Sequence, residues 1–186
     1  VGYCVEDLDN FNSVTGRFNI ICTGGCLGET QDGSCPDFAA SNVPGTSNPY
    51  GVIGDWDVSR VTNMEHMFSG SQFNGDLSEW NTGAVTNMDH MFAAATVFNQ
   101  DLSKWNTGAV TDMSFMFTDS AFNSDISKWN TGAVTSMSFM FQGAIAFNVD
   151  ISKWNTVGVT NMRAMFANSD FNGDLSKWNT GAVTNM

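Results

Sequence analysis

The sequence predicts an α/β repeat solenoid, with short parallel strands on one side, short helices on the other and a disulfide-stabilised cap at the N-terminus. Two observations predict the repeats, and a third sets the cap apart. Tryptophan recurs every 24 or 25 residues, and the methionines of the same region come in pairs such as Met88 and Met91. All four cysteines lie before this region. The tryptophans, expected to form an internal column, are Trp56, Trp80, Trp105, Trp129, Trp154 and Trp178.

Length, composition and charge narrow the class of protein. The chain has 186 residues, of which 42% are hydrophobic, enough for a sizeable core. Its 19 acidic and 7 basic residues give a net charge of −12, which disfavours nucleic acid and anionic membrane surfaces as partners. No apolar run approaches the roughly 18–20 residues of a membrane helix, so direct membrane insertion is not expected. Cationic partners, metal ions or carbohydrate fit this charge better.

Residues 1–54 are expected to form a cap and linker. Their four cysteines, in a Gly-rich and weakly periodic segment, favour two disulfides and therefore an extracellular or surface location. The chain begins at Val1 without Met, and we expect a signal peptide to have been removed upstream. The alternative is a four-cysteine zinc site, and three disulfide pairings remain open. The residues concerned are Cys4, Cys22, Cys26 and Cys35.

Two further features of this segment predict local structure. Asp7 and Asp9 have the spacing of half a calcium loop, but Phe11 occupies the next ligand position, so a solvated acidic turn is expected instead. Residues 42–51 contain two prolines and several turn-forming residues, and they are expected to be the loop that joins the cap to the repeats.

Residues 55–186 are expected to contain about five repeats and an incomplete sixth. In the segment 85–95 the apolar residues step by three and four, which predicts one face of a short helix. Thr86 would be its N-cap, and Asp89 would return a hydrogen bond to the cap backbone. Arg163 occupies the position of Asp89 in its own repeat and cannot accept that hydrogen bond.

The second half of each repeat, such as residues 98–106, predicts a short strand with flanking bends. The step from the helix Phe to the strand Phe alternates between five and six residues, which places the extra residue in the connection that leaves the helix. Stacked helices are wider than strand spacing, so the array should bend into an arc. A buried amide ladder is expected to satisfy the backbone at the bends, formed by Asn74, Asn99, Asn123, Asn148 and Asn172.

The repeat Val-Thr-x-Met-x-x-Met-Phe-x-x-x-x-Phe-Asn-x-Asp-Leu/Ile-Ser-x-Trp-Asn resembles the unit of BspA-like leucine-rich-repeat surface proteins, including the mycoplasma surface-lipoprotein family of unknown function. The resemblance covers residues 55–186. It implies a leucine-rich-repeat-like solenoid on a cell or particle surface, used for adhesion, for binding or as a structural module. It carries no catalytic residues over to this chain, and residues 1–54 do not match the pattern.

Catalysis is not expected, because every reactive-looking side chain of the repeats recurs in register whereas a catalytic site needs one asymmetric group. His66 and His90 occupy a column that continues as Phe115, Phe139 and Ala164, and they are expected to be variable flanking positions. One aspartate column raises the question of calcium, since like charges at coil spacing attract a cation. The favoured interpretation is that these carboxylates accept backbone or hydroxyl hydrogen bonds and bridge to the lysine column Lys104, Lys128, Lys153 and Lys177, which is headed by Glu79. The column is Asp76, Asp101, Asp125, Asp150 and Asp174.

Three functions follow as expectations. The first is a non-enzymatic surface module that recognises protein or glycan. The second is a building block that stacks with copies of itself into a filament or lattice, because the sequence stops at Met186 in the first turn of a new unit and a lone solenoid needs a cap there. The third is a calcium-dependent adhesin.

Overall fold

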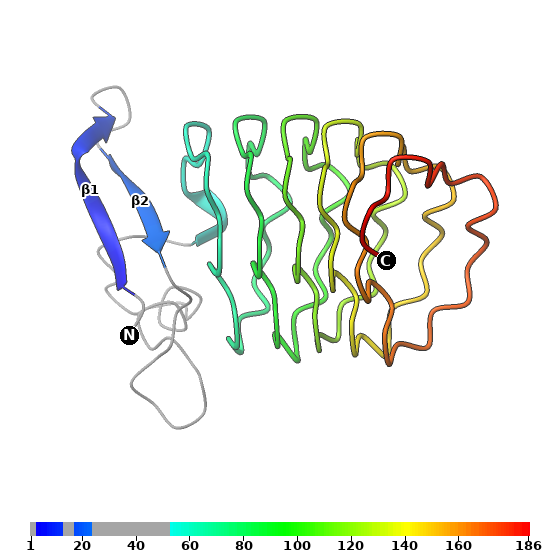
Figure 1. Ribbon diagram of the computed structural model, residues 1–186. Coiled ribbons are helices and arrows are strands. Elements are labelled where there is room, and N and C mark those ends of the chain that lie inside the picture. The colour runs from blue at the N-terminus through cyan, green and yellow to red at the C-terminus, as the bar shows by residue number, and fades with distance from the viewer. Residues whose placement is uncertain (1–2, 13–16, 24–52) are drawn as a thin grey trace.

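The computed structural model describes residues 3–12, 17–23 and 53–186. Cys26, Cys35 and the expected loop at 42–51 lie outside the described residues. The first two described segments form an antiparallel pair, β1 (Tyr3–Asn12) and β2 (Arg17–Thr23), drawn in blue in Figure 1. Their register places Cys4 opposite Cys22.

The acidic turn expected around Asp7 and Asp9 is wrong, because both residues belong to β1. The pairing with β2 is irregular between Asp7 and Phe11, as at a β-bulge. Aromatic and β-branched residues favour extended backbone, and both strands contain them, including Tyr3 and Val5 in β1. That preference overrides the local turn preference of the aspartates.

The repeats form coils that lie side by side, as the cyan-to-red part of Figure 1 shows. A 3₁₀ helix, η1 (Ile53–Asp55), begins this region. Parallel bridges join equivalent backbone positions of neighbouring coils, beginning with Asn63 and Asn87 and ending with Asn161 and Asn185. The positions joined in series are 63, 87, 112, 136, 161 and 185.

The short helices expected in the repeats are absent from residues 56–186, and a six-residue turn segment takes the place of each. The backbone amides of a turn segment alternate between two kinds of acceptor. The amide of His90 donates to the Ser114 carbonyl of the next coil, and the amide of Met91 donates to the Met88 carbonyl of its own coil. The five turn segments are residues 65–70, 89–94, 114–119, 138–143 and 163–168.

Coil spacing explains why turns replace helices. The equivalent rings of Phe68 and Phe92 lie 5.3 Å apart, and those of Phe92 and Phe117 lie 5.7 Å apart. Helix axes need roughly 8–10 Å, so helices of neighbouring coils would separate these rings. The turn segments keep the coils close and still satisfy their backbone amides. Since these coils contain no helices within residues 56–186, helix width gives no reason for the array to bend into an arc.

The expected capping role of Thr86 is also wrong. Its hydroxyl and its amide both donate to the Thr62 carbonyl of the preceding coil, so the side chain joins two coils. Asp89 does not return a bond to that position; its amide donates to the side-chain oxygen of Asn87. Without a helix there are no free terminal amides for Thr86 to cap.

The second half of each repeat is not a strand within residues 97–106. Asp101 accepts a hydrogen bond from the Ser103 amide, and the Trp105 amide donates to the Leu102 carbonyl. Such local bonds bend the chain and compete with strand pairing. The extra residue of every second repeat lies in an exposed turn after the turn segment, at residues 96–97 and 145–146.

The core of the coils is built from stacked columns. The side chains that the sequence places on one helical face, Val85, Met88, Met91 and Phe92, are fully buried. Leu102 of the other half of the coil is buried as well. A repeated core of this kind is completed only when neighbouring coils stack.

Candidate functional site

The second residue of each turn segment projects from the same face of the stack and has a left-handed backbone. His66 and His90 have φ angles of 57° and 55°, and the equivalent Phe115 and Phe139 have 55° and 57°. Non-glycine residues seldom adopt this conformation, which costs about 1–2 kcal/mol per residue. Hydrogen bonds hold this backbone conformation in place, because successive amides of a turn segment donate alternately to a carbonyl of the next coil and to a carbonyl of their own coil.

These four side chains form a continuous stack of rings, which we call the ring column. The ring centroids of His66 and His90 lie 4.4 Å apart, those of His90 and Phe115 4.3 Å, and those of Phe115 and Phe139 4.6 Å. The guanidinium carbon of Arg163 lies 5.4 Å from the centroid of Phe139, within the range of a cation–π contact. All four rings are only half-buried, so the ring column forms part of the surface.

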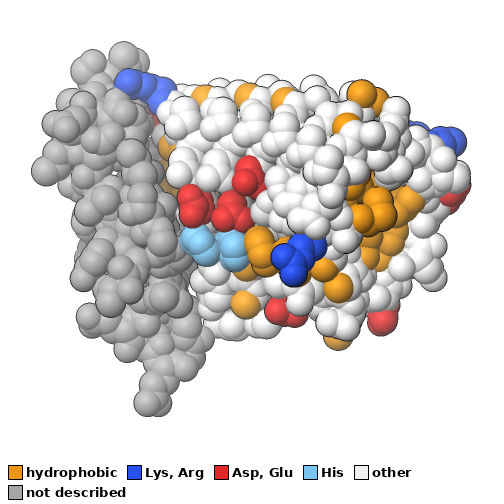
Figure 2. All heavy atoms as spheres, in the orientation of Figure 1, with side chains coloured by type: hydrophobic (Ala, Val, Ile, Leu, Met, Phe, Trp, Pro, Cys, Tyr) orange, Lys and Arg blue, Asp and Glu red, His pale blue; other side chains and the backbone are white. Residues whose placement is uncertain are grey.

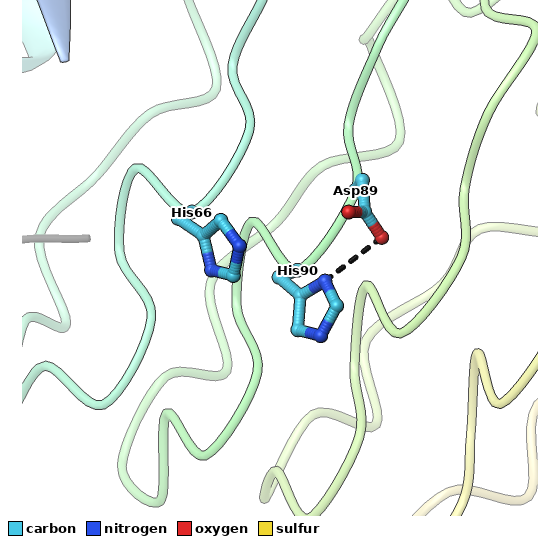
Figure 3. A group of neighbouring side chains, drawn as sticks. All are labelled: His66, Asp89 and His90. Atoms are coloured by element: carbon cyan, nitrogen blue, oxygen red, sulfur yellow. Dashed lines mark hydrogen bonds and ion pairs between the residues drawn. The ribbon is translucent and has the colours of Figure 1, made fainter. Parts of the chain in front are cut away.

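The histidine end of the ring column carries acidic side chains. Nδ1 of His90 lies 2.8 Å from Oδ1 of Asp89 (Figure 3). Nε2 of His66 lies 3.9 Å from Oε1 of Glu65. Burial raises the pKa of the Asp89 carboxyl above its ordinary value, while the hydrogen bond with His90 acts in the opposite direction. Asn87 also donates to Glu65, which ties two coils together at this point.

Figure 2 shows this face from the outside. Acidic side chains lie directly beside the two histidines, and hydrophobic and cationic side chains follow along the same row. The ligand atoms of His66, Asp89 and His90 all lie within 4.8 Å of one another. Within the described ranges, they form the group of three whose atoms could converge on one metal ion.

The aspartate column does not form such a group. Each member accepts a hydrogen bond from the amide of the serine two residues later, with lengths of 2.8–3.0 Å. These serines lower the pKa of every carboxyl in the column. Asp76, Asp101, Asp125, Asp150 and Asp174 are exposed and each closes a turn within its own coil.

Lys104, the first residue of the lysine column, is also exposed. Lys104 pairs with Glu79 of the preceding coil. Both side chains are more than half exposed, so this pair contributes little to stability.

The asparagine ladder exists, but it is exposed rather than buried. The amide of Asn99 donates to Oδ1 of Asn74 at 3.0 Å, and the amide of Asn123 donates to Oδ1 of Asn99 at 2.8 Å. The same bond recurs at Asn148 and Asn172. The amides need a partner in the neighbouring coil, but the side chains project outward at the bend and do not enter the core.

The tryptophans stack along the coils. The rings of Trp105 and Trp129 lie 6.4 Å apart and are parallel within 1°. The indole Nε1 of Trp129 donates to the Leu102 carbonyl of the preceding coil at 3.0 Å. Trp80, Trp105, Trp129 and Trp154 are buried, whereas Trp56 and Trp178 are partly buried.

Comparison with known protein families gives one finding. Residues 40–121 and 118–186 match the family described as "Mycoplasma protein of unknown function, DUF285". The chain belongs to the DUF285 family. Neither the curated proteins nor the solved structures contain a match to it.

The family match confirms a mycoplasma-type repeat and assigns no activity to it. In this DUF285 chain, the face that carries the ring column is built from positions that vary between repeats. The first residues of the turn segments are Glu65, Asp89, Ser114, Ser138 and Arg163. No helix among the described residues is long and apolar enough to cross a membrane.

Sequence reasoning missed two features of this DUF285 chain. One is the ring column, which could have been suspected because ring side chains occupy one position in four successive repeats. The other is a buried column of threonines whose hydroxyls donate to the next coil, as Thr107 does to the Asn130 carbonyl at 3.0 Å. Its members are Thr82, Thr107, Thr131 and Thr156.

Proposed function

We propose that the chain is a non-enzymatic recognition module of an extracellular or surface protein, and that it binds a protein partner through the ring column. The observation that carries this proposal is the half-exposed stack from His66 to Phe139, with Arg163 beside its last ring. Packing of the core does not require these rings, since Phe92 and Phe117 already fill the interior of the same coils.

Recognition is further supported by the division between constant and variable positions. The buried positions repeat nearly unchanged, as Met88, Met113 and Met137 do. The first two positions of the turn segments change from an acid and histidine in the first two coils, through serine and phenylalanine in the next two, to arginine and alanine in the last. A constant scaffold with a varied surface is typical of repeat proteins that bind partners.

The chemistry of the ring column favours a protein over a glycan. His90 and Phe115 are covered by neighbouring rings on both faces, so mainly their edges reach the solvent. Aromatic side chains and arginine are enriched where proteins bind one another. A glycan would instead need an open ring face, so glycan binding is the alternative outcome.

The surface location is a further part of this proposal. The four cysteines support an oxidising compartment, and β1 and β2 place Cys4 opposite Cys22. The repeat also resembles that of BspA-like leucine-rich-repeat surface proteins, which is consistent with an adhesive role. We also propose that the chain is a leucine-rich-repeat-like solenoid, because its coils lie side by side and are joined by parallel bridges.

The test is binding of the purified chain to intact cells, to extracellular proteins and to an immobilised glycan panel. Phe115→Ala with Phe139→Ala should weaken protein binding at least about tenfold, because these are the two apolar rings of the column. Alanine occurs naturally at this position of the fifth turn segment as Ala164, so the fold should tolerate it.

Ile145→Ser is the matched control, since Ile145 is 69% exposed and lies outside the ring column. Equal loss in the control and in the double variant would contradict the assignment. Binding to glycans alone would favour the glycan alternative. Light scattering belongs in the same experiment, because a mass that rises with concentration would favour the building-block role over recognition.

A further inference from the structure

We infer that His66, Asp89 and His90 form a binding site for one divalent transition-metal ion of the zinc, nickel and copper class. The inference does not depend on the recognition role proposed above. It follows from the placement of two imidazoles and a carboxylate on adjacent coils.

The residue types fit this class of ion. Imidazole nitrogen is a preferred ligand of zinc, copper and nickel, and a carboxylate oxygen completes many such sites. Calcium and magnesium prefer all-oxygen surroundings, so two histidines favour a transition metal. Glu65 stands next to His66 and offers a second carboxylate at the same place.

The distances require only small side-chain movements. A tetrahedral ion with bonds of about 2.0–2.1 Å holds its ligand atoms about 3.4 Å apart. The candidate ligand atoms already lie within 4.8 Å of one another. The side chains of His66, Asp89 and His90 are 33%, 23% and 29% exposed, so they have room to turn toward a common centre that solvent ions can reach.

The sequence places the acidic residue and the histidine together on the same two coils. Glu65 precedes His66, and Asp89 precedes His90. The next two turn segments replace this pair by serine and phenylalanine, and the last by arginine and alanine. Stacking of rings needs neither acid nor histidine, as Phe115 and Phe139 demonstrate. The paired change from Ser-Phe to acid-His therefore calls for a separate chemical reason, and metal ligation supplies one.

The array itself provides matched substitutions. His66→Phe with His90→Phe installs the side chain that Phe115 and Phe139 carry at equivalent positions, so the ring column is kept while both imidazoles are removed. Asp89→Ser installs the residue of Ser114. Asp112→Asn serves as the control, because it removes a neighbouring carboxylate and Asn is the residue at the equivalent Asn87.

The experiment titrates Zn²⁺ into the untagged full chain by calorimetry and follows Co²⁺ by its absorption spectrum. One Zn²⁺ per chain should bind, and Asp89→Ser should weaken binding by about ten- to a hundredfold. The double Phe variant should lose saturable binding, whereas Asp112→Asn should stay within about threefold of the parent. Near-ultraviolet circular dichroism verifies that the variants keep their packing.

Absence of saturable Zn²⁺ binding would overturn the inference. Unchanged binding in the double Phe variant would overturn it as well, as would Co²⁺ spectra with thiolate charge-transfer bands that persist in that variant, since these would place the ion on cysteines. If the double Phe variant fails to fold, Asp89→Ser decides on its own: unchanged affinity in that variant rejects the site.

Discussion

The indole Nε1 of Trp105 donates a 3.0 Å hydrogen bond to the Leu77 carbonyl of the preceding coil. The same carbonyl accepts the Trp80 amide at 3.1 Å, so one oxygen joins a local turn to the stack. The bond fixes the depth at which the Trp105 ring enters the core, where it lies 6.2 Å from the ring of Trp80.

Trp105→Phe should therefore destabilise the fold by about 2 kcal/mol, through the lost hydrogen bond and the cavity left by the smaller ring. Chemical denaturation measures the change. Trp178→Phe is the matched control, since Trp178 makes the same bond to Ile151 but is only partly buried. Its loss should be smaller, and equal losses would mean that burial of the ring does not set the cost.

The left-handed positions predict a contrast between two glycines. Gly70 and Gly143 have φ angles of 68° and 64°, but a Cβ at Gly70 meets open space while one at Gly143 meets the Asp119 carboxylate. Gly70→Ala should cost about 1–2 kcal/mol from backbone strain, and Gly143→Ala should cost more. Denaturation of both variants tests this.

Adding Asp119→Ala to Gly143→Ala should bring the free energy of unfolding back to the level of Gly70→Ala. Ala94 occupies the equivalent position in its own coil, which indicates that alanine is tolerated once the neighbouring carboxylate is absent. A double variant no more stable than Gly143→Ala alone would count against the clash with Asp119.

The aspartate column predicts that the fold loses stability in acid. The amide and hydroxyl of Ser103 lower the pKa of Asp101 below its ordinary value of 3.8, and the serines of the other coils act in the same way. A folded pKa below the unfolded one stabilises the protein above the unfolded value. That stabilisation is lost as the pH falls through the folded value.

The measurement is the midpoint of thermal unfolding from about pH 7 to about pH 2.5. The triple variant Asp101→Asn, Asp125→Asn, Asp150→Asn keeps an oxygen that accepts each serine amide but has no carboxyl to titrate. Its midpoint should therefore fall less steeply in acid than that of the parent. Curves of identical slope would show that these carboxylates do not contribute to acid sensitivity.

The register of β1 and β2 predicts a disulfide between Cys4 and Cys22. Opposed residues of an antiparallel pair have Cα atoms about 4.5–5.5 Å apart, within the range of about 4.4–6.8 Å that disulfides span. Peptide mapping without reduction should find Cys4 linked to Cys22. Linkage of either residue to Cys26 or Cys35 would contradict the prediction, and four free thiols after metal chelation would favour the zinc alternative.

The sequence determined which side chains of each repeat are buried but not the backbone that buries them. Val85, Met88, Met91, Phe92 and Ala95 are all inside, as their spacing predicts. A run of turns with left-handed residues four positions apart, such as His90 and Ala94, buries the same positions as a helix would. Spacing alone therefore cannot distinguish the two, and the deciding factor is the distance between coils.

The candidate site was predictable only in part. The repeat length placed His66 and His90 in one column, and the acids before them were visible in the sequence. Nothing in a helical interpretation would bring those acids and both rings to one surface, because that arrangement depends on the left-handed backbone. Outward projection of Asn74 and Asn99 likewise follows from turns that the sequence pattern did not reveal.

The hydrogen bonds that the turn segments donate to the neighbouring coil affect how the chain folds. Each formed coil presents a row of amides and carbonyls with fixed spacing, and this row can serve as a template for the coil that follows. The first pair of coils must form without a template, so it carries most of the entropic cost, and later coils add at lower cost. Folding should therefore nucleate at one pair of coils and propagate coil by coil. Hydrogen exchange should begin at the outermost coils and progress inward.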